Sequence, residues 1–502
     1  MKKQIGKQWT KSHYAKSVSW FFLHLLIYTL IAGGLLLGGQ LSNLGAYMKE
    51  QGANYLYAVF CTVLLFTIMY VYLFFENREV LMSGKNIALI FTILDIYLVL
   101  SVLIGRYIHV YARPIALVAL LIYTLMGRRD AVFISVICTM LVFVIDTFAT
   151  PDLANKECYS SLMIAFSASM FAIFFSNKAR TRFSVVFIGV LIVIPIDLIV
   201  FMLEISGFVG ATAEEIVAEP SFAALMTKMG YGLFGGMGST VLFVAILPVF
   251  ESAFNCLTVF RIRELTSSDS RILQKLKAEA PGTYNHSMIV AQLAEASAAA
   301  IGENVDYARA AALYHDVGKL HYPEHFTENQ GDYNLHDELT PELSADIIRS
   351  HAKDGYTFMR SHHLPEFLAD IAIQHHGTLP IRYFYAKALK MTDGELNIED
   401  FSYMGPKPQS KLAAIIMICD AAEAAVRAAN ARTPEQAEKA IRGVIEERMD
   451  LEQFAECDIT LGDLTKIRHA LVNTLTGVYH HRIKYPSIKY HRTDKGTKGE
   501  NQ

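Results

Sequence analysis

The sequence predicts an all-α protein in two parts, a multi-span helical membrane domain followed by an all-helical soluble domain. Three observations support this prediction. The chain has 502 residues, of which 53% are hydrophobic, and it is long enough for two or three domains. Residues 18–256 form a series of long apolar runs, whereas the rest has the mixed polar and apolar periodicity of soluble helices. Finally, histidines and aspartates recur along the second part in a pattern that fits a metal site.

The first part contains about eight apolar runs that are long enough, or nearly so, to cross a bilayer. They lie at roughly 18–39, 54–75, 87–105, 113–127, 131–149, 159–176, 182–204 and 232–256. The fourth run is short at its start, where Arg113-Pro114 interrupts it. Asp95, Asp146 and Asp197 fall within predicted spans, where a carboxylate either bonds to a neighbouring helix or serves a ligand-sensing face.

The charges of the loops predict the orientation of the spans. Residues 1–17 form a basic N-terminus, and the run that follows is too long for a cleaved signal peptide, so we expect a retained signal anchor. With a cytoplasmic N-terminus, the inner loops carry more Lys and Arg than the outer loops, as the positive-inside rule requires. Eight spans then return the chain to the cytoplasm, which places the second part there.

Composition excludes some partners and compartments. The net charge of −3 produces no broad positive field, so we expect no nucleic acid polymer as a partner. The six cysteines are not spaced as disulfide or metal pairs, which favours a reduced cytoplasmic environment for the second part.

The second part is predicted to be helical throughout. Residues 257–281 form a linker helix that Pro281-Gly282 ends, residues 282–484 form the soluble domain, and residues 485–502 form a polar tail. Four helices are expected in the first part of the domain: 283–301, capped by Thr283; one capped by Asp306; one capped by Thr340, with Pro341 as its first residue; and one that begins at Pro365 and is ended by Gly377. Three more are expected after them: 411–430, one that begins with a capping box at Thr433, and 461–483.

Seven side chains in these helices predict a site for two divalent metals. They are His286, the adjacent pair His315 and Asp316, His351, the adjacent pair His375 and His376, and Asp420. Imidazole and carboxylate groups suit borderline metals such as iron, manganese or zinc. Asp316 has two oxygens and can bridge two ions, and such a pair activates water and clamps a phosphoryl oxygen. The pattern therefore predicts phosphate-ester hydrolysis, with Asp316 as a catalytic residue.

Two further residues are predicted to act on the substrate. Lys319 follows the His-Asp pair by three positions and could neutralise a phosphate, so it is a candidate for both catalysis and substrate binding. His321 lies in the polar loop that follows and is a candidate to protonate the leaving oxygen; a solvated loop histidine is the alternative.

The motifs around these residues resemble the membrane-anchored seven-transmembrane HD family, within the HD-domain phosphohydrolase superfamily. The resemblance rests on Glu279-Ala-Pro-Gly-Thr-Tyr-Asn-His286, Tyr314-His-Asp-Val-Gly-Lys319, Glu328-Asn-Gln330, Ser350-His-Ala-Lys-Asp-Gly355, Gln374-His-His-Gly-Thr378 and Tyr383-Phe-Tyr385. It implies a bacterial, multi-pass plasma-membrane enzyme that hydrolyses the second messenger cyclic di-AMP to pApA. It also implies iron or manganese as the metals and Tyr383 as a substrate contact, and it is compatible with a homodimer.

The resemblance also implies how the ligands divide. One metal takes His286, His315, Asp316 and Asp420, and the other takes Asp316, His351, His375 and His376. The sequence departs from the family in one respect: typical members carry a large extracytoplasmic domain after the first span, and here the gap is only about residues 40–53. The receptor role that this domain serves is therefore not implied for this chain.

Two alternatives remain open at this point. A cyclic di-GMP phosphodiesterase would carry a Gly-Tyr-Pro motif near the paired histidines, but here Gly377-Thr378-Leu379-Pro380 follows them. A signalling protein that binds nucleotide without cutting it would be expected to have lost ligands, and all seven are present.

Overall fold

The computed structural model describes residues 11–37, 42–148, 150, 153, 155–179, 181–205, 222–331, 333–391, 394–431 and 433–478. The chain forms two compact units, Met1–Leu265 and Thr266–Gln502. Their boundary falls within the predicted linker helix, which the structure divides into α11 (Val259–Thr266) and α12 (Arg271–Glu279). The residues between them are mostly serines, and Ser267 accepts a hydrogen bond from the Asp269 amide, which competes with helix formation. The predicted polar tail, 485–502, lies outside the described residues.

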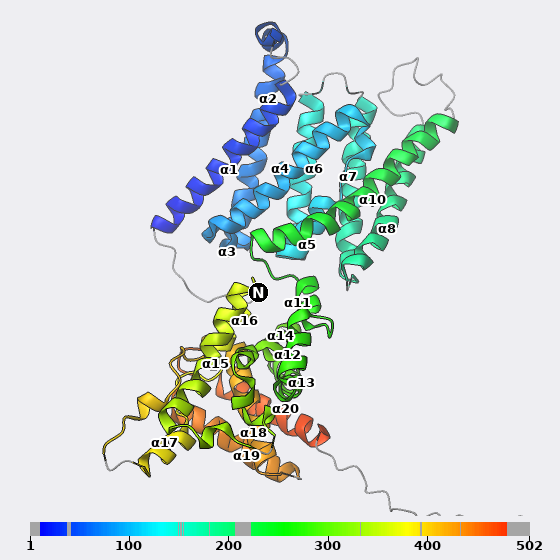
Figure 1. Ribbon diagram of the computed structural model, residues 1–502. Helices are drawn as coiled ribbons and strands as arrows, with labels where there is room; N and C mark the ends of the chain where they lie inside the picture. Colours follow the sequence, from blue (N-terminus) through cyan, green and yellow to red (C-terminus); the bar gives the residue numbers. More distant parts are fainter. Residues whose placement is uncertain are drawn as a thin grey trace, which may run out of the picture. The chain divides into compact units, whose positions relative to one another are not determined.

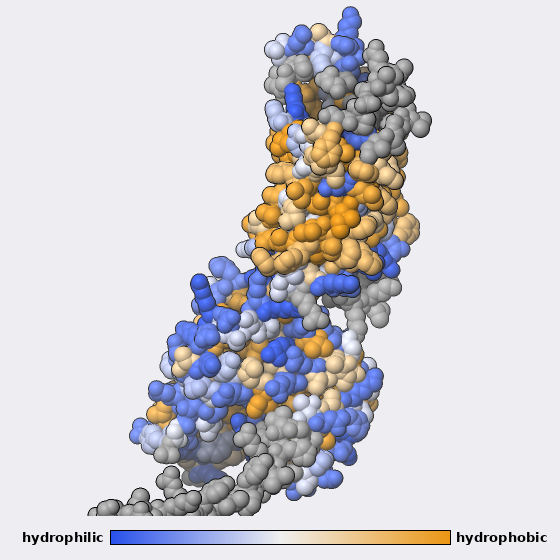
Figure 2. All heavy atoms as spheres, turned by 90° about the vertical axis from the view of Figure 1, so that its right-hand side faces the viewer, coloured by the Kyte–Doolittle hydropathy of each residue, from blue (hydrophilic) through white to orange (hydrophobic). Residues whose placement is uncertain are grey.

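The first unit is a helical membrane domain (Figure 1). Seven of its described helices are long and apolar enough to cross a bilayer, and Figure 2 shows apolar side chains gathered around them. Its long helices are α1 (Lys11–Leu37), α2 (Leu44–Glu76), α4 (Gly84–Tyr107), α6 (Arg128–Phe148), α7 (Asn155–Ser176), α8 (Arg182–Ile205) and α10 (Phe222–Ala253), and the short α3 (Arg78–Met82) lies between α2 and α4.

The fourth expected span differs from the other seven. In its place lie a short turn, η2 (Val110–Ala112), and a ten-residue helix, α5 (Leu117–Met126). Pro114 separates them because it has no amide hydrogen and disfavours helix in the preceding residue. Residues 117–122 are all buried, and α5 packs against α6, α7 and α10. The fourth segment is thus a short apolar helix enclosed by its neighbours, and the eight-span topology remains a prediction.

A buried ion pair joins the interrupted segment to α6. Arg113 donates two hydrogen bonds to the carboxylate of Asp146, with N–O distances of 2.6 and 2.8 Å. The same guanidinium donates to the Ser101 carbonyl at 3.0 Å and to the Ser161 hydroxyl at 3.2 Å. Of the two functions considered for Asp146, bonding to a neighbouring segment is therefore the one observed. Nearby, Gly235 of α10 allows close packing, since a Cβ there would lie 2.6 Å from the Tyr111 carbonyl oxygen.

We predict that Arg113→Met lowers the free energy of unfolding by about 3–5 kcal/mol, because it leaves Asp146 buried without a partner. Denaturation of the purified protein in detergent would measure the change. The double variant Arg113→Met/Asp146→Leu should recover most of the loss. The exposed pair Arg129–Glu76 provides a control, since Arg129→Met should change stability by less than about 1 kcal/mol. A single variant as stable as the wild type would contradict this role for the pair.

The second unit is built around two helices rich in small residues, α13 (Pro281–Ile301) and α18 (Lys411–Ala428). Alanines at 291, 294 and 298 of α13 and at 413, 414 and 422 of α18 are fully buried. Small side chains allow the helix axes to approach closely, and α13 also packs against α14 and α20. The other helices are α14 (Val305–Tyr314), α15 (Pro341–Ser361), α16 (Glu366–Gln374), α17 (Arg382–Leu389), α19 (Pro434–Asp450) and α20 (Leu461–Val478).

Several predicted helix ends are confirmed and two are wrong. The Thr340 side chain accepts from the Leu343 amide and the Thr433 side chain accepts from the Gln436 amide, as capping residues do. Asn304, not Asp306, caps α14, and accepts from the Tyr307 amide. Thr283 does not cap α13 either, because the helix already begins at Pro281. The predicted end of the last helix, 479–483, lies outside the described residues.

Candidate metal centre

The second unit brings all seven predicted ligands into one cluster. Two groups each have ligand atoms within 4.8 Å of one another: Asp316, His351, His375 and His376 in one, and His286, His315 and Asp420 in the other. Five segments contribute them, namely α13, the end of α14, α15, the end of α16, and α18. The helical packing therefore assembles residues that are far apart in the sequence.

Three of the histidines are oriented by their own helices. The Nδ1–H groups of His315, His351 and His375 donate to the carbonyl oxygens three residues earlier, at 2.7, 2.5 and 2.6 Å. His315 and His375 stand at helix ends, where such carbonyls have no partner in the helix. In a neutral imidazole this bond places the proton on Nδ1, so that the lone pair of Nε2 faces the cluster, as metal ligation requires.

Asp316 lies between the two groups. Its Oδ2 is 3.2 Å from His315 Nε2 and 3.8 Å from His286 Nε2, whereas its Oδ1 is 3.3 Å from His351 Nε2 and 3.6 Å from His375 Nε2. Each oxygen therefore faces one group, which fits a bridging carboxylate. His315 Nε2 and Asp316 Oδ1 are buried, and neither has a hydrogen-bond partner among the described residues. Buried atoms of this kind are normally satisfied, so their pattern fits divalent cations.

His286 is held between two carboxylates. Its Nε2 is 3.0 Å from Asp420 Oδ1, and its Nδ1 is 3.0 Å from Glu423 Oε2. Burial alone would lower the pKa of His286, but these two carboxylates raise it to about 10. The field in this part of the cluster is therefore strongly negative and attracts a cation. Glu423, fully buried one turn after Asp420, was not predicted as a site residue. It lies three residues after Asp420 on α18, and this spacing, which puts two side chains on the same face of a helix, could have indicated it.

Lys319 does not stand free for a phosphate. Its Nζ is 2.8 Å from Asp316 Oδ2 and 2.7 Å from Glu328 Oε1. Burial lowers its pKa, but the two carboxylates raise it well above the usual range, so Lys319 stays charged. Glu328 in turn accepts from the Thr283 hydroxyl, which ties this chain of contacts to the start of α13. The predicted role of Lys319 toward phosphate stays a prediction, and its observed partners are carboxylates.

One side of the cluster reaches solvent. The side chains of His376 and Asp420 are 20% and 15% exposed, whereas His315 and His375 are fully buried. Tyr403 lies beside this opening, with its ring stacked on His376 at a centroid distance of 4.3 Å. Sequence reasoning missed Tyr403 because it follows a short turn, η7 (Ile398–Phe401), with no pattern that places it at the site.

The two remaining predicted substrate residues lie elsewhere on the unit. His321, at the end of η3 (Val317–His321), is exposed and packs against Tyr322 with a centroid distance of 4.4 Å. Tyr383, on α17, is 66% exposed. Within the described part of the chain, no contact of either residue with the seven ligands is recorded. Both assignments stay predictions.

We predict that Gly318→Ala disrupts the cluster. A Cβ at this position would collide with the His351 carbonyl and the Gly355 amide of α15, both backbone groups that cannot move aside. Overpacking costs about 1–3 kcal/mol, and here it would also displace His351. Thermal unfolding and metal content after loading with Mn²⁺ would measure both effects. Gly443→Ala on α19, where a Cβ meets nothing, should leave both unchanged. Normal metal content in Gly318→Ala would contradict the prediction.

We predict that Glu423→Gln weakens metal binding by about 10–100-fold, because a neutral amide orients and polarises His286 less well than a carboxylate. Titration of the metal-free protein with Mn²⁺ would measure the affinity. Glu438→Gln on α19, an exposed pair with Arg442, serves as the control. Unchanged affinity in Glu423→Gln would show that Glu423 does not support His286.

Comparison with known proteins places both units. Residues 53–258 match the family described as 7TM receptor with intracellular HD hydrolase, and residues 283–425 match the HD domain family. The chain is 35% identical over 456 residues to the cyclic-di-AMP phosphodiesterase PgpH of Bacillus subtilis, a match that covers 90% of this chain and 62% of that protein. It is 46% identical over 265 residues to PgpH of Listeria monocytogenes, covering 53% of this chain and 37% of that one. The chain thus spans less than two thirds of the length of these relatives.

Two solved structures are also similar to the second unit. The crystal structure of the L. monocytogenes phosphodiesterase PgpH HD domain is 47% identical and covers 42% of this chain and 100% of that one, with a TM-score of 0.41. The same domain in complex with cyclic di-AMP is 49% identical and covers 43% of this chain and 99% of that one, again with a TM-score of 0.41.

Proposed function

We propose that the chain is a member of the family of 7TM receptors with an intracellular HD hydrolase, and that it is a metal-dependent phosphodiesterase that hydrolyses cyclic di-AMP to pApA. The observation that carries this proposal is the position of Asp316, with one oxygen toward each of two histidine groups. The relatives that bear the name cyclic-di-AMP phosphodiesterase support the choice of substrate.

The residues present fit two divalent metals, and we propose iron or manganese. His286, His315 and Asp420 would hold one ion, His351, His375 and His376 the other, and Asp316 both. Bound there, the ions would supply an activated water and neutralise charge on the phosphoryl group. The chain supplies imidazole nitrogens, a shared carboxylate and a buried set of ligands, so that hydrolysis takes place where His376 and Asp420 reach solvent.

Lys319 and Tyr403 take different roles in this proposal. Lys319 pairs with both Asp316 and Glu328, and its positive charge offsets part of the negative charge of these two buried carboxylates. Tyr403 offers an aromatic ring at the opening, where an adenine base can stack once the phosphate is in place. The leaving oxygen needs a proton, and His321 remains the candidate from the sequence.

The cellular setting is part of the same proposal. The excess of Lys and Arg in alternate loops of the membrane domain supports a cytoplasmic second unit in a bacterial plasma membrane. Substrate and product would then both be cytoplasmic nucleotides, with the bilayer as the other partner. A homodimer is compatible with this arrangement.

Incubation of the purified full-length protein with cyclic di-AMP and Mn²⁺ should produce pApA, detected by chromatography. Asp316→Asn should reduce the rate by at least about 10³-fold, because the bridging charge is lost. Glu438→Gln is the matched carboxylate control on the surface. Absence of pApA from metal-loaded protein would reject the proposal, and faster cleavage of cyclic di-GMP would reassign the substrate.

We predict that Tyr403→Ala lowers kcat/KM for cyclic di-AMP by about tenfold, mainly through KM, because base stacking on an aromatic ring contributes about 1–3 kcal/mol. Tyr403→Phe keeps the ring and should stay close to the wild type. Tyr383→Ala would test the other predicted aromatic contact in the same assay. If Phe and Ala variants of Tyr403 lost activity equally, the hydroxyl and not the ring would be responsible.

A further inference from the structure

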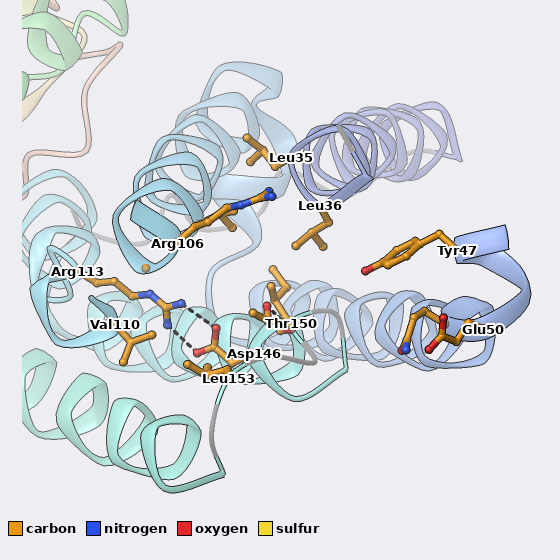
Figure 3. Close-up of a pocket in the computed structure, with 14 residues that line it drawn as sticks. Leu35, Leu36, Tyr47, Glu50, Arg106, Val110, Arg113, Asp146, Thr150 and Leu153 are labelled. Atoms are coloured by element: carbon orange, nitrogen blue, oxygen red, sulfur yellow. Dashed lines mark hydrogen bonds and ion pairs between the residues drawn. The ribbon is translucent and has the colours of Figure 1, made fainter. Parts of the chain in front are cut away.

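A cavity of about 650 Å³ lies within the membrane domain (Figure 3). Four helix ends and the interrupted segment line it. Leu35 and Leu36 come from the end of α1, Tyr47 and Glu50 from the start of α2, and Arg106 from the end of α4. The volume is within the usual range for small-molecule sites, about 300–1,000 Å³.

The buried ion pair described above forms one wall of this cavity. The guanidinium of Arg113 donates hydrogen bonds to Asp146, Ser101 and Ser161. Its charge is thereby balanced by Asp146, and both side chains are nearly inaccessible to water, at 6% and 1% exposure. This wall is therefore a rigid polar surface whose net charge is zero.

Two opposite charges remain for a ligand. Arg106 and Glu50 both line the cavity and are exposed to it, and no ion pair of either is recorded among the described residues. Figure 3 shows Arg106 on one side of the space and Glu50, with Tyr47, on the other. A guanidinium favours an anionic carboxylate or phosphate, whereas a carboxylate favours an ammonium group.

Most of the other lining residues are apolar, and Gln51, Thr150 and the hydroxyl of Tyr47 add uncharged polar groups. Leu35, Leu36, Val110 and Leu153 surround the space between the two charges. Because Arg113 and Asp146 neutralise each other, a purely anionic ligand would face the charge of Glu50, and a purely cationic one would face that of Arg106. A molecule with both charges and an apolar part matches every wall.

We propose that this cavity binds a small zwitterion that has an ammonium group, a carboxylate or phosphate, and an apolar part. Arg106 binds the anionic group, Glu50 binds the ammonium group, and the leucines contact the apolar part. The helix ends that form the cavity are at the opposite end of the membrane domain from the C-terminal end of α10 (Figure 1). By the predicted topology, the end of the membrane domain that contains the cavity is extracytoplasmic. Two sources share the required chemistry: a short apolar peptide from outside the cell, and the headgroup region of phosphatidylethanolamine.

The test uses the full-length protein in nanodiscs of phosphatidylglycerol. In one arm, L-leucyl-L-leucine is titrated and its binding measured by calorimetry. In the other arm, phosphatidylethanolamine is added to the lipid mixture and its retention on the protein is measured by native mass spectrometry. We expect saturable binding in one arm, which identifies the source. No binding in either arm would overturn the proposal.

Variants then test the zwitterion. Arg106→Gln and Glu50→Gln should each weaken binding by at least about tenfold, since each removes a charge-assisted contact. Arg129→Gln and Glu76→Gln, on α6 and α2 at the other end of the domain, are matched controls and should bind as the wild type does. Thermal unfolding of every variant identifies any that is misfolded.

The response of Glu50→Gln separates a zwitterion from an anion. If the cavity takes an anion, this variant should bind N-acetyl-L-leucine more tightly than the wild type does, and the dipeptide no more weakly. Either result would overturn the proposal. The exchange variant Arg106→Glu/Glu50→Arg should restore binding lost in the single variants, because a zwitterion can bind in the reversed direction.

Discussion

The second unit depends on one constraint: the carboxylate of Asp316 is buried among the imidazoles of four histidines. A buried charge of this kind is stable only when partners surround it, which requires four helical segments, α13, the end of α14, α15 and the end of α16, to meet within a few ångströms. The alanines of α13 and α18 make that approach sterically possible, and Gly318 allows the loop after Asp316 to lie directly on α15. Packing and chemistry are therefore specified by the same residues, because any change that separates the helices also separates the ligands.

A buried carboxylate in the membrane domain also needs partners, but there they are all supplied by the protein. Asp146 is also a buried carboxylate, but a bidentate arginine satisfies it completely. Asp316 Oδ1 and His315 Nε2 instead are buried atoms that have no hydrogen-bond partner in the described part of the chain. The first arrangement fixes a structure, whereas the second leaves coordination to something that the chain binds. This contrast in hydrogen bonding separates Asp146 from Asp316, although both carboxylates are buried.

The sequence predicted the helical class, the seven side chains that the fold brings together and several helix caps, since each depends on local spacing or on residue chemistry. Thr340 and Thr433, for example, act through neighbours three residues away. Ligation of metal by those seven residues stays a prediction. Features that depend on long-range contacts were missed. Glu423 and Tyr403 become site residues only when α18 and the loop after η7 pack beside His286 and His376. Two predicted caps were wrong. Asp306 was chosen although Asn304, two residues earlier, is the cap of α14, and Thr283 was chosen although Pro281 already begins α13.

The cavity in the membrane domain lies where the short connection between α1 and α2 brings the ends of these two helices together. Only residues 38–43 separate α1 from α2, so no large folded domain lies between them in this chain. The helix ends at that end of the domain supply Arg106 and Glu50 on facing sides of one space. Among the described residues no ion pair of either side chain is recorded, which leaves both charges to be satisfied by water or a ligand. The same electrostatic argument that explains the metal centre therefore indicates a second binding site, built from opposite charges of the protein and selective for a ligand that carries both.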